Sequence, residues 1–220
     1  MKKIIIPFAI FALFIANSLE AATIKVWHEM HDNAPSAVNA EGILKASPNA
    51  IWETLIRFND FAKFMPRVRE SFFITQEGVD ALKKTKTNHI NKIQEIARLY
   101  KTDDHRLKGG KWEGFVFMVL NTPFPVTNRW YILHTIHDES EAFQDKFYRC
   151  WNLVFGNIEN AQGCWYLQPA EEPSHTFARY QDSIHPGGNV PRWAARMGAT
   201  QTIPQMFKNL ESEVLRIQNQ

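Results

Sequence analysis

The feature that most constrains the fold is the stretch from Lys111 to about Ile184, where apolar residues recur in the pattern typical of β-strands. Turn residues, among them Pro123-Phe124-Pro125 and Gly156-Asn157, divide this stretch into separate runs. Because the connections between the runs are short, consecutive strands are expected to pair antiparallel. The pattern predicts strands at 112–120, 129–137, 143–155, 164–168 and 176–184.

A long helix is predicted directly after this sheet. Pro186-Gly187-Gly188 ends the last strand, and Asn189-Val190-Pro191 has the composition of a helix start. The helix should run to about Ile217, with a kink at Pro204. The sequence therefore favours an α+β fold in which one antiparallel sheet wraps around a C-terminal helix. The apolar stripe of that helix recurs at helical spacing and consists of Ile203, Phe207, Leu210, Val214 and Ile217.

The region before the sheet is predicted to begin with a polar lead-in, a strand and a helix. Residues 23–40 are polar with scattered apolar residues, and Glu41–Ala46 has the pattern of a short strand. Ser47-Pro48 supplies the N-cap and first-turn residues that start a helix. Asn59-Asp60 should interrupt this helix, and Pro66 should end it.

A helical insertion is predicted between this part and the sheet. A strand is expected at 68–76, and residues 79–100 then show helical periodicity with charged residues on the other face. One or two helices account for the pattern. The insertion covers about 79–108 and ends at Gly109-Gly110.

The N-terminus has the pattern of a secretory signal peptide. Met1-Lys2-Lys3 is followed by an uncharged apolar run, Ile4–Ala16, which is too short to span a bilayer as a helix. We expect residues 1–22 to be cleaved, so that the protein is periplasmic or secreted; the alternative is an uncleaved N-terminal anchor. The mature chain, 23–220, is expected to be a single domain with its core at about 40–218.

The charge of the mature chain excludes some classes of partner. The whole sequence has 25 basic and 23 acidic residues, and cleavage would remove Lys2, Lys3 and Glu20. A chain so close to neutral gives no indication of a nucleic-acid partner, whereas transient contact with a membrane remains compatible with it. The sequence leaves the oligomeric state open.

The two cysteines predict the register of one hairpin. Period-2 alternation in 143–155 puts one apolar set on the inner face of the sheet: Phe143, Asp145, Phe147, Arg149, Trp151, Leu153 and Phe155. Pairing Cys150 with Cys164 brings both cysteines to the outer face, and export permits a disulfide between them. The register is self-consistent, because apolar faces then meet with Arg149 opposite Trp165 and Phe147 opposite Leu167.

Arg149 is an unexpected residue on a mostly apolar face. Local twist of the strand could bring it to solvent. Alternatively it is buried and paired with an acid, for which Asp182 is one candidate, or with the polar end of a ligand. The sequence leaves these alternatives open.

Four stretches of the chain, covering about 40–218, resemble the START-like superfamily of hydrophobic-ligand-binding and lipid-transfer domains. The resemblance is to the branch that contains polyketide cyclases and coenzyme Q-binding proteins. Each stretch is short, and their order and spacing carry the resemblance. They are Ala46-Ser47-Pro48-Asn49-Ala50-Ile51-Trp52 with Phe61-Ala62-Lys63-Phe64-Met65-Pro66, then Pro123-Phe124-Pro125-Val126-Thr127-Asn128-Arg129-Trp130, then Gly163-Cys164-Trp165-Tyr166-Leu167-Gln168-Pro169, and finally Pro191-Arg192-Trp193 followed by Ile203-Pro204 and Leu210.

The resemblance implies a helix-grip fold, in which a curved antiparallel sheet grips the C-terminal helix around a cavity for an apolar ligand. The insertion at about 79–108 departs from the simple pattern, and it could either close the cavity or cover the sheet. The family shares no single catalytic set, so the resemblance implies no catalytic residue. The expected ligand-binding residues are Trp130 or Tyr131, Phe147, Arg149, Trp165, Tyr180, Trp193 and Met197.

Motifs for metal, cofactor and nucleophile chemistry are weak. His28 and His31 have no third ligand at suitable spacing, and His134 and His137 point to opposite faces of a strand. The sequence has no phosphate loop, nucleophile elbow or dinucleotide glycine pattern, and we expect no metal and no cofactor.

The sequence favours an exported, non-enzymatic carrier or binding protein for a lipid, quinone or similar hydrophobic small molecule. The alternatives are a cyclase- or hydrolase-like enzyme and a ligand-free structural or interaction domain. The enzyme would need an acid or base in the cavity, and its candidates are Arg149, Tyr180, Asp182 and His185.

Overall fold

The computed structural model describes residues 24–29, 37–103, 106–122, 127–172, 174–187 and 192–220, and for 192–199 it describes the backbone alone. The predicted signal peptide, 1–22, therefore lies outside the described residues. Among the described residues, no helix is both long and apolar enough to cross a bilayer.

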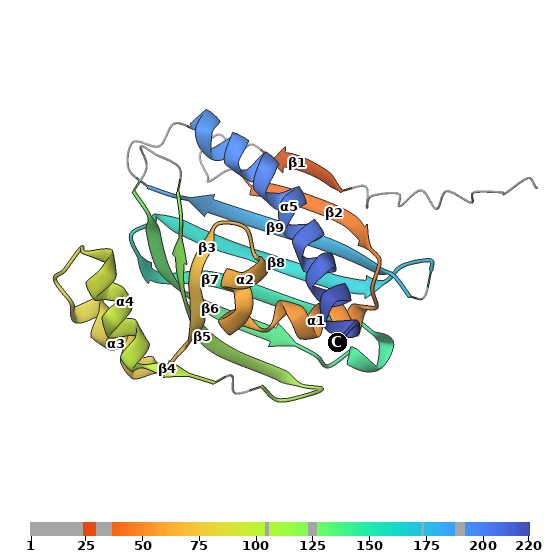
Figure 1. Cartoon of the computed structure of the whole chain (residues 1–220), viewed down its shortest axis with the longest axis horizontal. Coiled ribbons are helices and arrows are strands. Elements are labelled where there is room, and N and C mark those ends of the chain that lie inside the picture. The colour runs from red at the N-terminus through yellow and green to blue at the C-terminus, as the bar shows by residue number, and fades with distance from the viewer. Residues whose placement is uncertain (1–23, 30–36, 104–105, 123–126, 173, 188–191) are drawn as a thin grey trace, which may run out of the picture.

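One antiparallel sheet of nine strands forms the body of the structure (Figure 1). Its strand order is β1-β2-β9-β8-β7-β6-β5-β3-β4, and α5 lies across one face, which we call the inner face. This arrangement confirms the α+β, helix-grip prediction. The strands are β1 (Lys25–Glu29), β2 (Ala37–Leu44), β3 (Val68–Ile74), β4 (Lys101–Thr102), β5 (Lys111–Leu120), β6 (Arg129–Asp138), β7 (Phe147–Gly156), β8 (Asn160–Pro169) and β9 (Thr176–His185). The helices are α1 (Pro48–Leu55), α2 (Phe61–Phe64), α3 (Gln76–Lys84), α4 (Ile90–Leu99) and α5 (Arg192–Gln218), with short 3₁₀ turns η1 (Phe58–Asp60) and η2 (Ala142–Gln144).

Helix α1 begins where the sequence predicts. The Ser47 hydroxyl accepts a hydrogen bond from the Ala50 backbone N–H at 3.4 Å, and Pro48 occupies the first helical position. The chain then breaks before α2, as predicted, but earlier than Asn59-Asp60, because α1 ends at Leu55 and both residues lie within η1. Helix α2 is tied to α5, because the Asn209 side chain donates to the Phe64 carbonyl oxygen at 2.7 Å.

The apolar stripe of α5 packs on the inner face of the sheet. Ile203, Phe207, Leu210 and Val214 are buried there, and the Phe207 ring lies 4.9 Å from the ring of Trp165 on β8. Burial of this stripe holds the helix against the sheet.

The helical insertion covers the outer face of the sheet. Val79 and Leu82 of α3 and Ile93 of α4 pack in a second cluster with residues such as Phe117 and Trp130 of the sheet. Figure 1 shows α3 and α4 beside β3, β4 and β5, away from α5. Of the two alternatives for the insertion, covering the sheet is the one that the structure has.

Two predicted boundaries and one predicted side-chain orientation were wrong. The lead-in 23–40 contains β1 and the start of β2, which begins at Ala37. Phe143 lies in η2 with 82% of its surface exposed, because Asp145 adopts a left-handed conformation (φ 54°) that separates this turn from β7. Phe155 faces outward rather than inward.

A bulge explains the outward position of Phe155. Ile132 of β6 pairs with Phe155, whereas the next residue, Leu133, pairs with Leu153. The extra residue in β7 reverses the alternation at this point. Phe155 consequently packs against Trp130 on the outer face, with ring centroids 5.6 Å apart.

Candidate functional site

Half of the sheet's inner face is filled by aromatic side chains. Trp52 of α1 stacks on Phe147 of β7, with ring centroids 5.2 Å apart and an interplanar angle of 20°. The Trp112 ring stacks on the imidazole of His137, with ring centroids 3.6 Å apart. Burial lowers the pKa of His137 to about 2, so its ring stays neutral at physiological pH. We call this region, beneath α1, the filled half.

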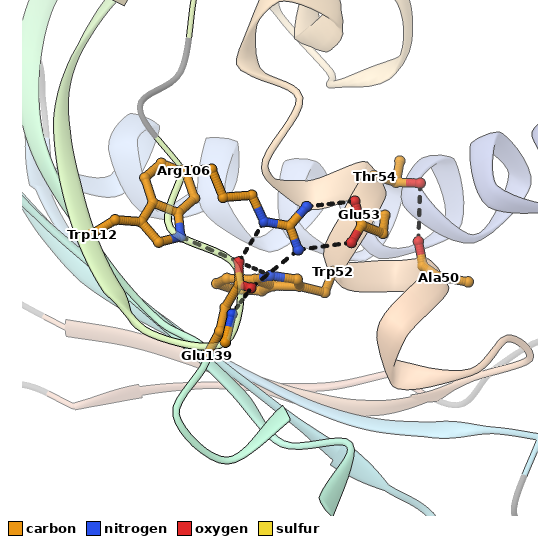
Figure 2. Close-up of polar contacts among 8 residues, drawn as sticks. Ala50, Trp52, Glu53, Thr54, Arg106, Trp112 and Glu139 are labelled. Atoms are coloured by element: carbon orange, nitrogen blue, oxygen red, sulfur yellow. Dashed lines mark hydrogen bonds and ion pairs between the residues drawn. The ribbon is translucent and has the colours of Figure 1, made fainter. Parts of the chain in front are cut away.

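A buried polar network closes the filled half (Figure 2). The Glu139 carboxylate accepts hydrogen bonds from the indoles of Trp52 and Trp112, at 2.9 and 3.2 Å. Arg106 donates to Glu139 at 2.7 and 3.1 Å and to Glu53 at 2.8 Å twice, so its guanidinium bridges the two carboxylates. This network joins the end of the insertion to α1 and to the end of β6.

The other half of the inner face encloses a cavity of about 350 Å³. Its floor is formed by β5 to β9, and the segment from η1 to β3 and the helix α5 form its other walls. Most of the lining is apolar. The apolar lining residues are Val38, Phe58, Phe61, Met65, Pro66, Val68, Met118, Leu120, Leu133, Trp151, Ile158, Ala161, Trp165, Ile184, Pro186, Ile203 and Met206. The polar ones are Arg67, Asn121, Thr122, Arg129, Tyr131, Thr135, Arg149, Tyr180, Asp182 and Thr202.

Arg149 lies at the boundary between the filled half and the cavity. Its side chain is 4% exposed, and its Nη1 donates to the carbonyl oxygen of Leu55, at the end of α1, over 2.6 Å. The guanidinium carbon lies 4.9 Å from the Phe58 ring and 5.5 Å from the Trp151 ring. Burial lowers the pKa of Arg149 to about 9, which leaves it charged at neutral pH.

The structure thus decides between the alternatives for Arg149. It is buried rather than turned to solvent. Among the described residues no carboxylate forms an ion pair with it, Asp182 included. Its partners are a helix-end carbonyl and aromatic faces, both of which stabilise a cation.

Asp182 is the acidic residue of the cavity wall, and it lies beside Tyr180 and Trp151. Register places Trp151 of β7, Gly163 of β8 and Asp182 of β9 side by side. A Cβ atom at Gly163 would lie 2.4 Å from the Trp151 indole, so the glycine gives the indole room to lie across β8 toward Asp182. Burial raises the pKa of Asp182 to about 7, although hydrogen bonds from Tyr180, the Ser183 backbone and Trp151 act in the opposite direction.

The two tyrosines beside Asp182 remain protonated. Burial raises the pKa of Tyr131 and of Tyr180, and the negative charge of Asp182 raises both further. The site therefore presents phenol hydroxyls and a carboxyl group that titrates near neutral pH on an otherwise apolar wall.

The cavity opens at a rim that carries positive charge. Arg67 and Asn121 line the cavity and are exposed, and they mark its open side together with Arg129 and Thr202. Arg129 donates from Nε to the Pro186 carbonyl oxygen at 3.0 Å, and Arg67 donates to the Thr202 hydroxyl at 3.3 Å. The first bond joins the start of β6 to the residue after β9, and the second joins the residue before β3 to α5.

Comparisons with known proteins agree with this architecture. No protein-family model and no curated protein sequence matches the chain. Solved structures do match. A STAR-related lipid transfer protein fragment from Xanthomonas axonopodis has a TM-score of 0.61 at 22% identity, over 90% of this chain and 96% of that one. Human StAR-related lipid transfer protein 5 has a TM-score of 0.62 at 10% identity, over 92% and 90% of the two chains. The chain has a START-like fold. A Streptomyces aromatase/cyclase, Zhui, shares it with a TM-score of 0.54 at 8% identity, over 88% of this chain and 95% of that one.

Within this START-like fold, the residues predicted to bind a ligand separate into three groups. Tyr131, Arg149, Trp165 and Tyr180 line the cavity. Trp130 lies on the outer face in the second cluster, because its neighbour Tyr131 takes the inner position. Phe147 lies in the filled half, where Trp52 occupies the space over it. The side chains of Trp193 and Met197 lie outside the described residues.

Sequence reasoning missed several lining residues and included one acid–base candidate that lies outside the cavity lining. Met118, Leu133 and Met206 are ordinary apolar residues, which carry no signal of a cavity. Of the candidates for acid–base chemistry, Asp182 lies in the cavity wall, whereas His185 is absent from the cavity lining and its Nδ1 lies 2.7 Å from Glu159.

Cys150 and Cys164 lie directly opposite each other on β7 and β8, in the predicted register, and the structure joins them by a disulfide. Among the residues that the structure describes, no group of three or more His, Cys, Asp or Glu side chains is arranged to hold a metal ion. His28 lies in β1, and His31 lies outside the described residues.

Proposed function

We propose that this protein binds a hydrophobic small molecule, such as a lipid or a quinone, in the cavity between the sheet and α5, and carries it outside the cytoplasm. The supporting observation is the cavity itself. A space of about 350 Å³ with mostly apolar walls and an opening at its rim lies within the size range of ligand pockets. Burial of an apolar chain there contributes roughly 0.8 kcal/mol for each methylene group.

The structural neighbours make the same suggestion by their names. Two of them are described as lipid transfer proteins and one as an aromatase/cyclase. In this chain, Arg149 and the Asp182–Tyr180 pair supply the few polar groups that orient a mostly apolar ligand.

Mass spectrometry of an organic-solvent extract tests this function. The protein is purified from its native host without detergent and extracted, and a matched preparation of Ala161→Phe, which puts a ring into the cavity, is treated in the same way. We expect one class of apolar compound in molar proportion to the parent protein and less of it in the variant. Equal, trace amounts in both preparations would favour a ligand-free domain.

Export is the second part of the proposal, and it rests on Met1-Lys2-Lys3 and the short apolar run after it. Intact-mass measurement of protein from a fractionated host should show the loss of residues 1–21 or 1–22. A full-length species in the inner-membrane fraction would contradict cleavage. Carriage outside the cytoplasm depends on this result, whereas ligand binding does not.

A second candidate function is acid–base catalysis on the bound molecule. The observation in its favour is Asp182, whose pKa of about 7 suits a general acid or base, beside the Tyr180 hydroxyl. Incubation of the protein with its extracted ligand distinguishes the two functions. A carrier leaves the mass of the ligand unchanged. An enzyme changes it with time, and Asp182→Asn, with binding retained, should abolish that change.

A further inference from the structure

The charged residues of the cavity lining are mostly arginines, and none of these arginines forms an ion pair with an acid in the described part of the chain. The lining contains Arg67, Arg129, Arg149 and one acid, Asp182. Within the described part of the chain, no ion pair involves any of the three arginines. Several arginines away from the cavity do have an acidic partner: Arg98, for example, pairs with Glu70 at 2.6 Å. The cavity therefore has an excess of uncompensated positive charge.

Arg149 carries the inference, because its charge is buried. A guanidinium has five N–H donors, and the recorded hydrogen bond of Arg149 uses Nη1. Its Nε, which is buried, has no acceptor among the described residues. A role as a cap for α1 accounts for the bond to Leu55 but not for the remaining donors. Burying a cation without a matching acceptor is costly, so a group that completes its partners would bind favourably.

Asp182 is not that group. Its carboxyl faces Trp151 and Tyr180, and below neutral pH it is mostly protonated, since burial holds its pKa at about 7. It therefore does little to offset the positive charge of Arg149 in mildly acidic solution.

We propose that the ligand is an amphiphilic carboxylic acid, whose carboxylate binds Arg149 and whose apolar chain lies against the cavity walls. This inference rests on the proposed ligand-binding function. A carboxylate matches the planar fork of a guanidinium, and as a monoanion it is less costly to bury than the dianion of a phosphate monoester. At the rim, Arg67 and Arg129 attract the anion toward the opening.

Three probes built on a ten-carbon chain test the charge of the ligand. Decanoate carries a carboxylate, methyl decanoate keeps the carbonyl acceptor without the charge, and decylamine reverses the charge. Binding to the mature protein is measured by calorimetry at about pH 6, where an ordinary carboxylic acid is ionised. We expect decanoate to bind about ten- to a hundredfold more tightly than methyl decanoate, the range for a hydrogen bond to a charged group, and decylamine to bind weakly.

Two arginine variants locate the anion. Arg149→Gln should remove most of the preference for decanoate over its ester. The control is Arg179→Gln, which likewise removes one positive charge. Arg179 lies on β9 outside the cavity lining, and its side chain is 58% exposed. It should keep the preference. If Arg149→Gln does not fold, Arg149→Lys is used instead. Because it retains the charge, it should keep the preference for decanoate at reduced affinity. The three probes on the parent protein test the charge of the ligand in either case.

The outcomes separate this inference from the proposed function. Equal binding of decanoate and its ester, or tighter binding of decylamine, would overturn the inference and leave a hydrophobic binding protein. A preference for decanoate that survives Arg149→Gln would overturn the assignment to Arg149. If no probe binds, and the extract of the native protein contains no ligand, the proposed function fails and the inference fails with it.

Discussion

The indole of Trp52 stacks on the phenyl ring of Phe147, with ring centroids 5.2 Å apart. This contact marks the filled half of the inner face, since Phe147 is 3% exposed and neither residue lines the cavity. Four residues further along β7, Trp151 lines the cavity instead. One strand thus passes from a filled core to an open site, with Arg149 between them.

Phe147→Ala should therefore change stability and not ligand binding. Loss of a buried phenyl ring leaves a hole against Trp52 that the rigid sheet cannot close, and we expect a loss of about 3–5 kcal/mol in the free energy of unfolding. Urea denaturation measures that loss, and displacement of a fluorescent apolar probe measures binding in the folded variant. Weaker probe binding with unchanged stability would show that Phe147 belongs to the site.

Filling the cavity should have the opposite effect. Ala161 on β8 is buried and lines the cavity, whereas Ala178 on β9 is buried outside the cavity lining. Ala161→Phe should weaken apolar-probe binding at least tenfold with little change in stability, because its ring enters free space. The same change at Ala178 should overpack the core, cost about 1–3 kcal/mol and leave probe binding intact. Similar losses of stability in both variants would indicate that the cavity is already filled.

The sequence predicted the elements and the hairpin register, but not which half of the inner face is hollow. Pairing the two cysteines, with the period-2 alternation of both strands as a consistency check, was enough to set Cys150 opposite Cys164. It could not show that Phe147 is covered, because Trp52 reaches it from a distant helix. Nor could it separate Trp130 from Tyr131, since each is followed two residues later by an apolar residue, Ile132 or Leu133, and both alternating sets could therefore face inward.

Local irregularities were also hidden from the sequence. The bulge that turns Phe155 outward depends on how β7 pairs with β6, and no residue type marks it. The raised pKa of Asp182 was likewise hidden from the sequence. It arises from burial in a three-strand arrangement that forms only when the sheet is complete.

Gly163→Ala should disturb this arrangement. A Cβ atom at this position would lie 2.3 Å from the Gln181 backbone oxygen and 2.4 Å from the Trp151 indole. Because the first of these is backbone of a paired strand, the clash cannot be relieved by a side-chain rotation, and we expect a loss of about 1–3 kcal/mol in stability with a shifted tryptophan emission. At Gly110 the nearest atom is 3.7 Å away, so Gly110→Ala is the control. Equal stability of both variants would contradict the tight packing at Gly163.

Glu139→Gln should destabilise the folded protein at neutral pH. Burial alone would raise the pKa of Glu139, but hydrogen bonds from Arg106, Trp52, Gly109 and Trp112 outweigh it and lower the pKa. Removing this buried charge leaves Arg106 with Glu53 as its remaining acidic partner, and we expect a loss of about 3 kcal/mol. The loss is fully present above the ordinary carboxyl pKa and shrinks as the pH falls below it.

The control for this change is Glu141→Gln, whose carboxyl is 59% exposed and lies 3.6 Å from Lys146. Denaturation midpoints of this variant should stay close to those of the parent protein. If Glu139→Gln behaves like Glu141→Gln at neutral pH, the buried network does not stabilise the fold.

Asp182→Asn should make stability less dependent on pH between about 4 and 7. The folded protein holds the Asp182 proton up to a pKa of about 7, whereas the unfolded chain releases it near 3.9. Between these values the folded state binds more protons than the unfolded state, so the free energy of unfolding of the parent protein falls as the pH rises. The full contribution of this group is present below about pH 4 and is lost above about pH 7. Asparagine has no such proton, so the stability of the parent relative to Asp182→Asn should decrease across this window and level off above it.

Urea denaturation at a series of pH values measures the difference, with Asp80→Asn on the exposed face of α3 as the control for the loss of one carboxyl. A constant difference across the window would show that Asp182 is ionised in the folded protein, and the cavity would then present a permanent negative charge beside Tyr180.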